Sequence, residues 1–387
     1  MSVADARKIL VDAIAARVFP AATVDVGWSG GILWREALGT LTFDDESQAT
    51  SASTPFDLAS LTKPIATTSA LLQLVCEDRV RLEDPVASFF AEWRGTDREP
   101  VTVRDLLEHA SGLSARLADP LPGGRRELEH DICTMPLEYA PRAQSVYSDL
   151  GFLLLGFLIA DRGGASLASQ FEAIAVRLMA MTVRLEPDPT SVTTPRLEAD
   201  ATNATTLDGI PDGTDGGFLT FALSAAGRRR AAPTRPEPVD SRRGRVLAGE
   251  VHDHYAAALG GVAGHAGLFG TAAAVGAFAR LVLRAARGDT TIPAPLSPAL
   301  VALAVTRSTV AGSSRALGWD RMLPTSSCGT RMSPSAFGHV GFTGTSLWID
   351  PVRDRYFALL TNRAYGGGTL DEMRATRRAF HDALGDR

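Results

Sequence analysis

Lysine and cysteine are both rare in this sequence of 387 residues. Only Lys8 and Lys63 are lysines among 39 basic residues, so no Gly-Lys-Ser/Thr phosphate loop is present. The three cysteines, Cys76, Cys133 and Cys328, are widely separated and form no C-x-x-C pair. This spacing excludes a dense disulfide framework or a cysteine zinc site, and we expect buried free thiols.

Excess positive charge and long apolar runs are also missing. The net charge is −5, so no basic field would attract nucleic acid, and no apolar run reaches the 18 residues that a membrane span needs. The N-terminus lacks the order of segments found in a signal peptide, which favours a cytoplasmic location. The hydrophobic fraction of 45% and charged fraction of 21% are typical of a globular chain, here of one large or two interleaved domains.

Two common hydrolase signatures are not supported either. H-E-x-x-H is absent, and the one G-x-S-x-G match, GWSGG at 27–31, lies in the glycine turn of an expected hairpin instead of a strand-to-helix turn, which disfavours a zincin site and an α/β-hydrolase elbow. The one compact group of candidate metal ligands is His252, Asp253 and His254, whose H-x-H spacing fits a metal only loosely. We therefore expect no metal and no cofactor, although ordinary hydrogen bonding and a weak metal site both stay open for this group.

Periodicity predicts strands at both ends of the chain with helices between them. The expected elements are a hairpin at 22–42, helices at 60–77, 147–161 and 166–181, long loops at 186–217 and 225–250, helices at 271–287 and 296–305, strands across 337–361 and a helix at 369–384. This order indicates a two-domain α+β or α/β fold, with an antiparallel sheet flanked by N- and C-terminal helices. We predict a discontinuous sheet domain (1–59 and 255–387), a mostly helical inserted domain (60–254) and an active site between them.

Ser60 and Lys63 are the strongest candidates for chemistry. They lie three residues apart in the nearly uncharged stretch FDLASLTKPIATTSALLQLV, which places both side chains on one face of a helix. A serine hydroxyl needs a neighbouring base, and an amine is such a base only when its pKa falls well below about 10.4. Apolar surroundings would supply that shift, so we expect Lys63 to be an uncharged amine.

Three ordered segments resemble the motifs of the serine β-lactamase-like superfamily. They are FDLASLTKP, then Tyr147-Ser148-Asp149, then His339-Val340-Gly341, at positions similar to the S-x-x-K, Y-x-N and K/H-T-G motifs. That superfamily includes low-molecular-weight penicillin-binding proteins, class C β-lactamases and family VIII carboxylesterases. The resemblance covers most of the chain, and it implies the same split fold.

The resemblance also implies a role for each matching residue. Ser60 would be the acyl-accepting nucleophile, Lys63 its proton acceptor, and Tyr147 a phenolic acid or base facing them. The backbone N–H groups of Ser60 and Phe342 would form the oxyanion hole, which stabilises the transition state by about 2.7–4 kcal/mol per donor. The substrate-binding residues implied are Asp149, His339, Val340 and Gly341. Outside the motifs, structural roles are favoured for His109 and His265.

Two departures from the motifs indicate the substrate class. Asp149 stands where asparagine is usual, and Val340 stands where a threonine hydroxyl binds the ligand's carboxylate in penicillin-recognising relatives. Both changes should weaken binding of an anion, so we predict hydrolysis of a small neutral ester through a serine acyl-enzyme. A β-lactamase, a D-alanyl-D-alanine carboxypeptidase, an acyltransferase and a non-catalytic penicillin-binding-like sensor stay open as alternatives. The sequence does not determine the oligomeric state.

Overall fold

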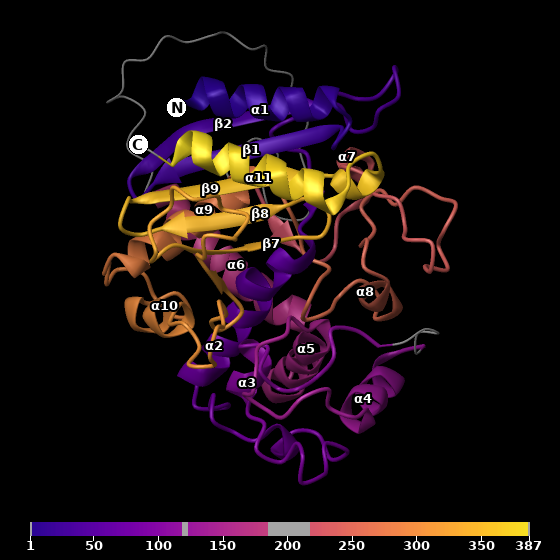
Figure 1. The fold of residues 1–387 in the computed structure, drawn as a ribbon, viewed down its shortest axis with the longest axis vertical. Helices are drawn as coiled ribbons and strands as arrows, with labels where there is room; N and C mark the ends of the chain where they lie inside the picture. The colour runs from indigo at the N-terminus through magenta and orange to yellow at the C-terminus, as the bar shows by residue number, and fades with distance from the viewer. Residues whose placement is uncertain (1, 118–122, 185–216, 386–387) are drawn as a thin grey trace.

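The computed structural model describes residues 2–117, 123–184 and 217–385. Its main feature is a six-stranded antiparallel sheet in the order β2-β1-β9-β8-β7-β6 (Figure 1). The strands are β1 (Ala21–Trp28), β2 (Gly31–Gly39), β6 (Asp320–Arg321), β7 (Phe337–Val340), β8 (Ser346–Asp350) and β9 (Arg355–Thr361). The first and last strands of the chain meet at the centre of the sheet, where β1 pairs with β9.

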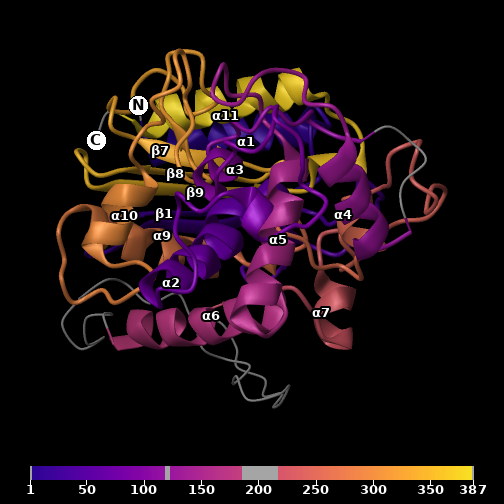
Figure 2. The same cartoon turned by 90° about the horizontal axis from the view of Figure 1, so that it is seen from below.

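Helices cover both faces of this sheet. α1 (Val3–Ala15) and α11 (Leu370–Leu384) lie side by side on one face, and α9 (Ala272–Ala286) packs on the other (Figures 1 and 2). Side chains alternate between the two faces, as the pleat requires: Phe357 and Leu359 of β9 enter the core under α1 and α11, whereas Ala358 and Leu360 enter the core under α9. The sheet is therefore buried on both sides.

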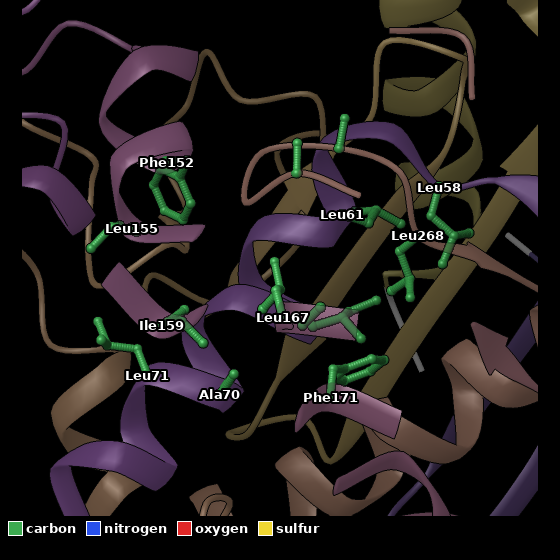
Figure 3. Close-up of a cluster of buried hydrophobic side chains, with 14 of the residues drawn as sticks. Leu58, Leu61, Ala70, Leu71, Phe152, Leu155, Ile159, Leu167, Phe171 and Leu268 are labelled. Carbon is green, nitrogen blue, oxygen red and sulfur yellow. The ribbon is translucent and has the colours of Figure 1, made fainter. Parts of the chain in front are cut away.

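The remaining elements form a mostly helical region beyond the sheet. They are η3 (Val86–Ser88), α3 (Val103–Leu107), α4 (Arg125–Thr134), α5 (Asp149–Gly163), α6 (Leu167–Arg184), α7 (Ala225–Arg230), α8 (His254–Ala258) and α10 (Pro298–Ala304). A small sheet of β3 (Phe56–Asp57), β5 (Phe269–Gly270) and β4 (Leu219–Thr220) lies beside them. Figure 3 shows the apolar cluster that joins the two regions, with Ile159 of α5 beside Leu71 of the helix α2 (Ser69–Cys76).

The segment from residue 59 to residue 76 is helical, but it is not the regular helix that we expected. It contains a 3₁₀ turn (Ala59–Leu61, η1), a π-helical segment (Lys63–Thr68, η2) and the α-helix α2 (Ser69–Cys76). Every side chain of the π segment is buried, as the absence of a polar face predicted. Proline at position 64 has no N–H to donate, which explains why regular hydrogen bonding does not begin there.

The fold class that the sequence predicted is confirmed: an antiparallel sheet is flanked by N- and C-terminal helices, with helices between its halves. The expectation that 225–250 is entirely loop was wrong, because Ser224 caps α7 through a hydrogen bond to the Gly227 amide. The loop expected at 186–217 lies almost wholly outside the described residues. The division at residues 59 and 255 stays a prediction.

Within the described ranges, no single helix has the length and apolar character of a membrane span. The helical segments Asp149–Gly163 and Leu167–Met181 are long and apolar enough only when they are taken together, and they meet at a bend of 79°.

Candidate active site

The backbone around Ser60 is held in a tight and strained turn. Ala59 has a positive φ of 47°, which is uncommon for a residue with a Cβ atom. The buried carboxylate of Asp57 accepts the Ala59 amide at 2.8 Å and the His252 amide at 2.6 Å. Burial raises the pKa of Asp57 to about 6. These two backbone hydrogen bonds fix the turn that presents Ser60, and strain of this kind is commonly found at functional sites.

Ser60, Lys63 and Tyr147 lie in direct contact, although Tyr147 is far away in the sequence. Lys63 Nζ lies 3.2 Å from Ser60 Oγ and 2.6 Å from the Tyr147 hydroxyl. The Tyr147 hydroxyl donates to Ser60 Oγ at 2.7 Å. Ser60 and Lys63 come from the 3₁₀ turn and the π segment, and Tyr147 precedes α5, whose N-terminus is capped by Ser148. A nucleophile, an amine and a phenol therefore share one hydrogen-bonded group.

The charge of Lys63 differs from the sequence-based expectation. Lys63 is fully buried as expected, but its Nζ also lies 2.7 Å from Asp149 Oδ1 and 3.3 Å from the His265 carbonyl oxygen. Burial acts to lower the pKa of Lys63, but the Asp149 carboxylate and the Tyr147 oxygen outweigh it, and the pKa is raised. The expected uncharged amine is therefore wrong for the resting enzyme, because the neighbouring carboxylate stabilises the ammonium form.

Tyr147 is enclosed by aromatic and basic side chains. The His109 ring lies 4.7 Å from the Tyr147 ring, the His339 ring lies 5.9 Å away, and the Arg315 guanidinium lies 5.1 Å above it. Burial raises the pKa of Tyr147, so the phenol keeps its proton at neutral pH. His109 also accepts the Ser148 amide through Nδ1, which agrees with the structural role expected for it.

A chain of polar contacts that the sequence did not predict continues from Lys63 through Asp149, Arg116 and Asp253 to His265. Asp149 Oδ2 lies 3.3 Å from Arg116 Nε, Arg116 Nη2 lies 3.1 Å from Asp253, and Asp253 lies 2.8 Å from His265 Nε2. Burial acts to raise the pKa of Asp149, but Lys63 and His265 outweigh it and the pKa is lowered. The sequence pointed to Asp149, Asp253 and His265 separately, but no sequence signal marked Arg116 or the contacts that connect these residues.

A cavity of about 300 Å³ opens above Ser60. Most of the residues that line it are of polar or charged type, and the full set is Ala59, Ser60, Ala115, Arg116, Tyr147, Asp149, Glu237, His252, Asp253, His254, His265, Ala266 and Phe342. Three of the substrate-binding residues that the resemblance implied, namely His339, Val340 and Gly341, are not among these lining residues. Asp149 is the one implied substrate-binding residue that lines the cavity.

His339 lies behind Tyr147 rather than at the cavity surface. It is 2% exposed, its Nδ1 bonds its neighbour's carbonyl (Val340 O) at 2.9 Å, and its Nε2 has no partner among the described residues. Burial lowers the pKa of His339 to about 3, so the ring is neutral. Gly341 packs closely, because a Cβ atom there would lie 2.7 Å from the Leu58 carbonyl oxygen.

Phe342 follows β7 and reaches the cavity. Among the described residues, neither its amide nor that of Ser60 donates to an intramolecular acceptor, so both N–H groups are available to a ligand. The Phe342 ring is 38% exposed and stacks on His252, at 5.3 Å between centroids. Burial lowers the pKa of His252 to about 4, which makes this stacking partner uncharged at neutral pH.

The donor atoms of Asp149, Asp253 and His265 lie within 4.8 Å of one another, which is close enough for a metal ion. Both carboxylates, however, already bind cationic side chains, Asp149 through Lys63 and Arg116, and Asp253 through Arg116. The two carboxylates of this set therefore act as counterions of Lys63 and Arg116. In the described part of the chain, the suspected H-x-H pair does not gather a third ligand.

This chain is similar to known proteins both in sequence and in fold. A sequence model of the family described as Beta-lactamase matches residues 6–381. A protein of Escherichia coli strain K12 named "Putative D-alanyl-D-alanine carboxypeptidase" is 27% identical over 348 residues, which cover 84% of this chain and 73% of that protein.

Solved structures share the fold across almost the whole chain. EstCE1, described as a hydrolase with promiscuous acyltransferase activity, superposes with a TM-score of 0.69 at 17% identity, covering 98% of this chain and 100% of its own. A penicillin-binding protein homologue from Caulobacter crescentus gives a TM-score of 0.70 at 18% identity, covering 98% and 97%. At these identities the likeness concerns the fold alone.

Proposed function

This chain belongs to the beta-lactamase family of serine hydrolases, and we propose that it cleaves small, uncharged carboxylic esters through an acyl-enzyme on Ser60. The observation that carries the proposal is Asp149, a carboxylate that lines the cavity 2.7 Å from Lys63 Nζ. With Glu237 and Asp253 it makes three carboxylates around the space that an acyl group would occupy. A ligand with its own carboxylate would be repelled there, whereas an ester would not.

The proposed reaction begins with attack of Ser60 Oγ on the ester carbonyl carbon. The serine proton passes to the minor, uncharged form of Lys63, directly or through the Tyr147 hydroxyl, and the resulting oxyanion accepts the Ser60 and Phe342 amides. The C–O bond to the alcohol then breaks, and the leaving oxygen takes a proton from Tyr147, which Lys63 replaces. Water repeats the sequence on the acyl-enzyme and releases the acid.

Removal of the serine hydroxyl tests the proposal directly. We expect Ser60→Ala to lose hydrolysis of p-nitrophenyl acetate and butyrate by about 10⁴-fold or more, because the nucleophile is gone and only binding and the oxyanion hole remain. Mass spectrometry of the wild-type protein should show one acyl group on Ser60. Ser88→Ala, an exposed serine in the helical region, is the matched control. Equal turnover in Ser60→Ala and the wild type would reject the nucleophile.

A second candidate is removal of a terminal D-alanine from a peptide, which is the activity given in the name of the Escherichia coli relative. Arg116 favours it, since the partly exposed guanidinium lines the cavity and could bind a terminal carboxylate. Its pairing with Asp149 and Asp253 argues against it. Release of D-alanine from a D-Ala-D-Ala peptide, or nitrocefin hydrolysis at the rate of the esters, would replace the ester proposal. Stoichiometric acylation without turnover would instead indicate a sensor.

Product analysis separates hydrolysis from acyl transfer. With a p-nitrophenyl ester and added methanol, the proposal predicts the free acid as the main product. A methyl ester as the main product would make the protein an acyltransferase.

A further inference from the structure

Arg377 of α11 is a buried arginine that the proposed reaction does not use. Among the described residues no carboxylate lies within ion-pair distance of it, and burial together with Arg363 lowers its pKa to about 9. A buried charge without a counterion is costly, and such groups occur where they serve a function more often than elsewhere. The question is therefore what this guanidinium binds.

Arg377 binds backbone carbonyls in the turn between β7 and β8. Its Nη2 donates to the Gly341 and Thr345 carbonyl oxygens, both at 2.8 Å. The Gly341 carbonyl and the Phe342 N–H belong to the same planar peptide unit. A donor that fixes the oxygen of this unit therefore also fixes the direction of the Phe342 N–H, which is the second amide of the proposed oxyanion hole.

A second guanidinium holds the next peptide unit. Arg363 of η5 (Arg363–Tyr365) donates to the Phe342 carbonyl oxygen from Nε at 3.2 Å and from Nη2 at 2.6 Å. The two guanidinium groups are close enough to repel, since Arg363 acts together with burial to lower the pKa of Arg377. The fold nevertheless places both on consecutive carbonyls, one on each side of the Phe342 amide.

The same turn is bound to the strand that leads to Ser60. Thr343 Oγ1 donates to the Asp57 carbonyl at 2.7 Å, and Thr345 Oγ1 donates to the Leu58 carbonyl at 3.0 Å. The Gly341 amide closes the turn on the Thr345 carbonyl at 2.7 Å. The Ser60 and Phe342 amides thus belong to one connected backbone unit. Arg377 links this unit to helix α11.

We propose that Arg377 is a positioning residue that orients and polarises the Gly341–Phe342 peptide so that its N–H stabilises the oxyanion. A cationic donor on the carbonyl withdraws electron density from the peptide and strengthens the N–H as a donor, as in any chain of hydrogen bonds. The proposal rests on the proposed acyl-enzyme reaction. It assigns the oxyanion hole a support that comes from the last helix of the chain.

Arg377→Met removes the charge and both hydrogen bonds and is the first test. We expect kcat/KM for p-nitrophenyl butyrate to fall by about 10²–10³-fold with the loss mainly in kcat, as for removal of an oxyanion donor. The affinity for phenylboronic acid, whose tetrahedral adduct places an oxygen in the hole, should fall in parallel. Arg377→Lys, which keeps a charge and a donor, should recover part of both losses and serves if Arg377→Met does not fold.

The matched control is Arg98→Met. Arg98 is also a buried arginine that binds two carbonyls, those of Cys133 and Met135, at 2.5 and 2.8 Å, but it lies in the helical region. Its loss should lower stability and leave kcat and boronate affinity within a few-fold of the wild type. Wild-type kcat and boronate affinity in a folded Arg377→Met, or in Arg377→Lys if only that variant folds, would overturn the proposal.

A spectroscopic readout separates this proposal from the ester hypothesis. In protein labelled with ¹⁵N-phenylalanine, the Phe342 amide resonance, identified by its loss in Phe342→Leu, should shift in Arg377→Met and not in Arg98→Met. If the wild type cleaves no ester and binds no boronate, the ester hypothesis fails while this resonance still tests the positioning. An unmoved resonance in Arg377→Met would show that Arg377 does not control the peptide.

Discussion

At the scale of single residues, Asp149 connects two basic groups of the site. It binds the ammonium of Lys63 with one oxygen and Arg116 with the other, so it links the nucleophile's amine to the charged lining of the cavity. The amide that is usual at this position could accept a hydrogen bond from Lys63 but would not stabilise its charge. An aspartate at this position therefore raises the pKa of Lys63 and adds a carboxylate to the cavity lining.

Asp149→Asn should move the pH dependence of the reaction. The amine must be uncharged to accept the serine proton, and Asp149 raises its pKa, so wild-type kcat/KM should rise with pH toward the pKa of Lys63. Without the carboxylate, burial is less opposed and the pKa of Lys63 falls. We expect the rising limb of kcat/KM for a p-nitrophenyl ester to move to lower pH.

The control for this experiment is Asp253→Asn, the same isosteric change at a carboxylate that binds Arg116 and His265 but not Lys63. Its profile should shift much less. An unchanged profile in Asp149→Asn, or a shift to higher pH, would mean that Lys63 is not the titrating base.

The residues that could be predicted were those marked by the sequence itself. Lys63 was one of two lysines, it stood in an uncharged stretch, and Tyr147 followed in a recognisable motif. Arg116 could not be predicted, because 137 residues separate it from its partner Asp253 and only the tertiary fold brings them together. The predicted charge of Lys63 was wrong for a similar reason: the sequence indicated burial and contained Asp149, but it did not show that this carboxylate contacts the amine.

At the scale of elements, the loop that carries His265 crosses α5 at a contact between two glycines. A Cβ atom on Gly264 would lie 1.9 Å from the Phe152 carbonyl oxygen and 2.9 Å from the Gly156 amide nitrogen. The Gly264 carbonyl also accepts Thr67 Oγ1 at 2.6 Å. Backbones this close leave no room for a side chain, and they hold the loop beside the π segment that contains Lys63.

Gly264→Ala should therefore damage both stability and activity. The added methyl group would push the loop away from α5, at a cost of about 1–3 kcal/mol, and would move the His265 carbonyl that lies 3.3 Å from Lys63 Nζ. We expect a lower thermal midpoint and a lower kcat. Gly124→Ala is the control, because its Cβ would meet nothing within 4 Å. Equal effects of the two substitutions would show that the close approach is unimportant.

The element boundaries show where sequence patterns were sufficient and where they were not. The hairpin and the C-terminal helix followed from alternation and from a regular apolar face, and both were confirmed close to the expected residues. The π segment could not be predicted, since residues 63–68 are buried all round and their pattern carries no helical phase.

At the scale of the whole molecule, two separate cores stabilise the two faces of the sheet. The larger lies between the sheet and the inserted helices, and the smaller lies under α1 and α11. In the smaller core the rings of Phe380 and Trp34 lie 6.2 Å apart and join α11 to β2. Since α11 also carries Arg377, docking of this helix couples the smaller core to the turn beside Ser60.

Phe380→Ala tests this coupling. Loss of a fully buried phenylalanine typically costs about 3–5 kcal/mol, so the thermal midpoint should fall clearly. We further expect ester hydrolysis to be lost at a lower temperature than the helical signal measured by circular dichroism, because α11 would loosen first. Val352→Ala, a valine that is 71% exposed, is the control. If Phe380→Ala loses ester hydrolysis and the helical signal at the same temperature, then α11 does not loosen before the rest of the molecule, and the expectation is wrong.

The pairing of β1 with β9 also has a consequence for synthesis on the ribosome. The Ala21 amide binds the side chain of Asn362, 341 residues later in the chain. At translation rates of about 5–20 residues per second, β1 waits roughly 17–70 s for this neighbour. During that time the nascent hairpin exposes an unpaired edge, so binding of a chaperone to the N-terminal segment should persist until the final strand leaves the exit tunnel.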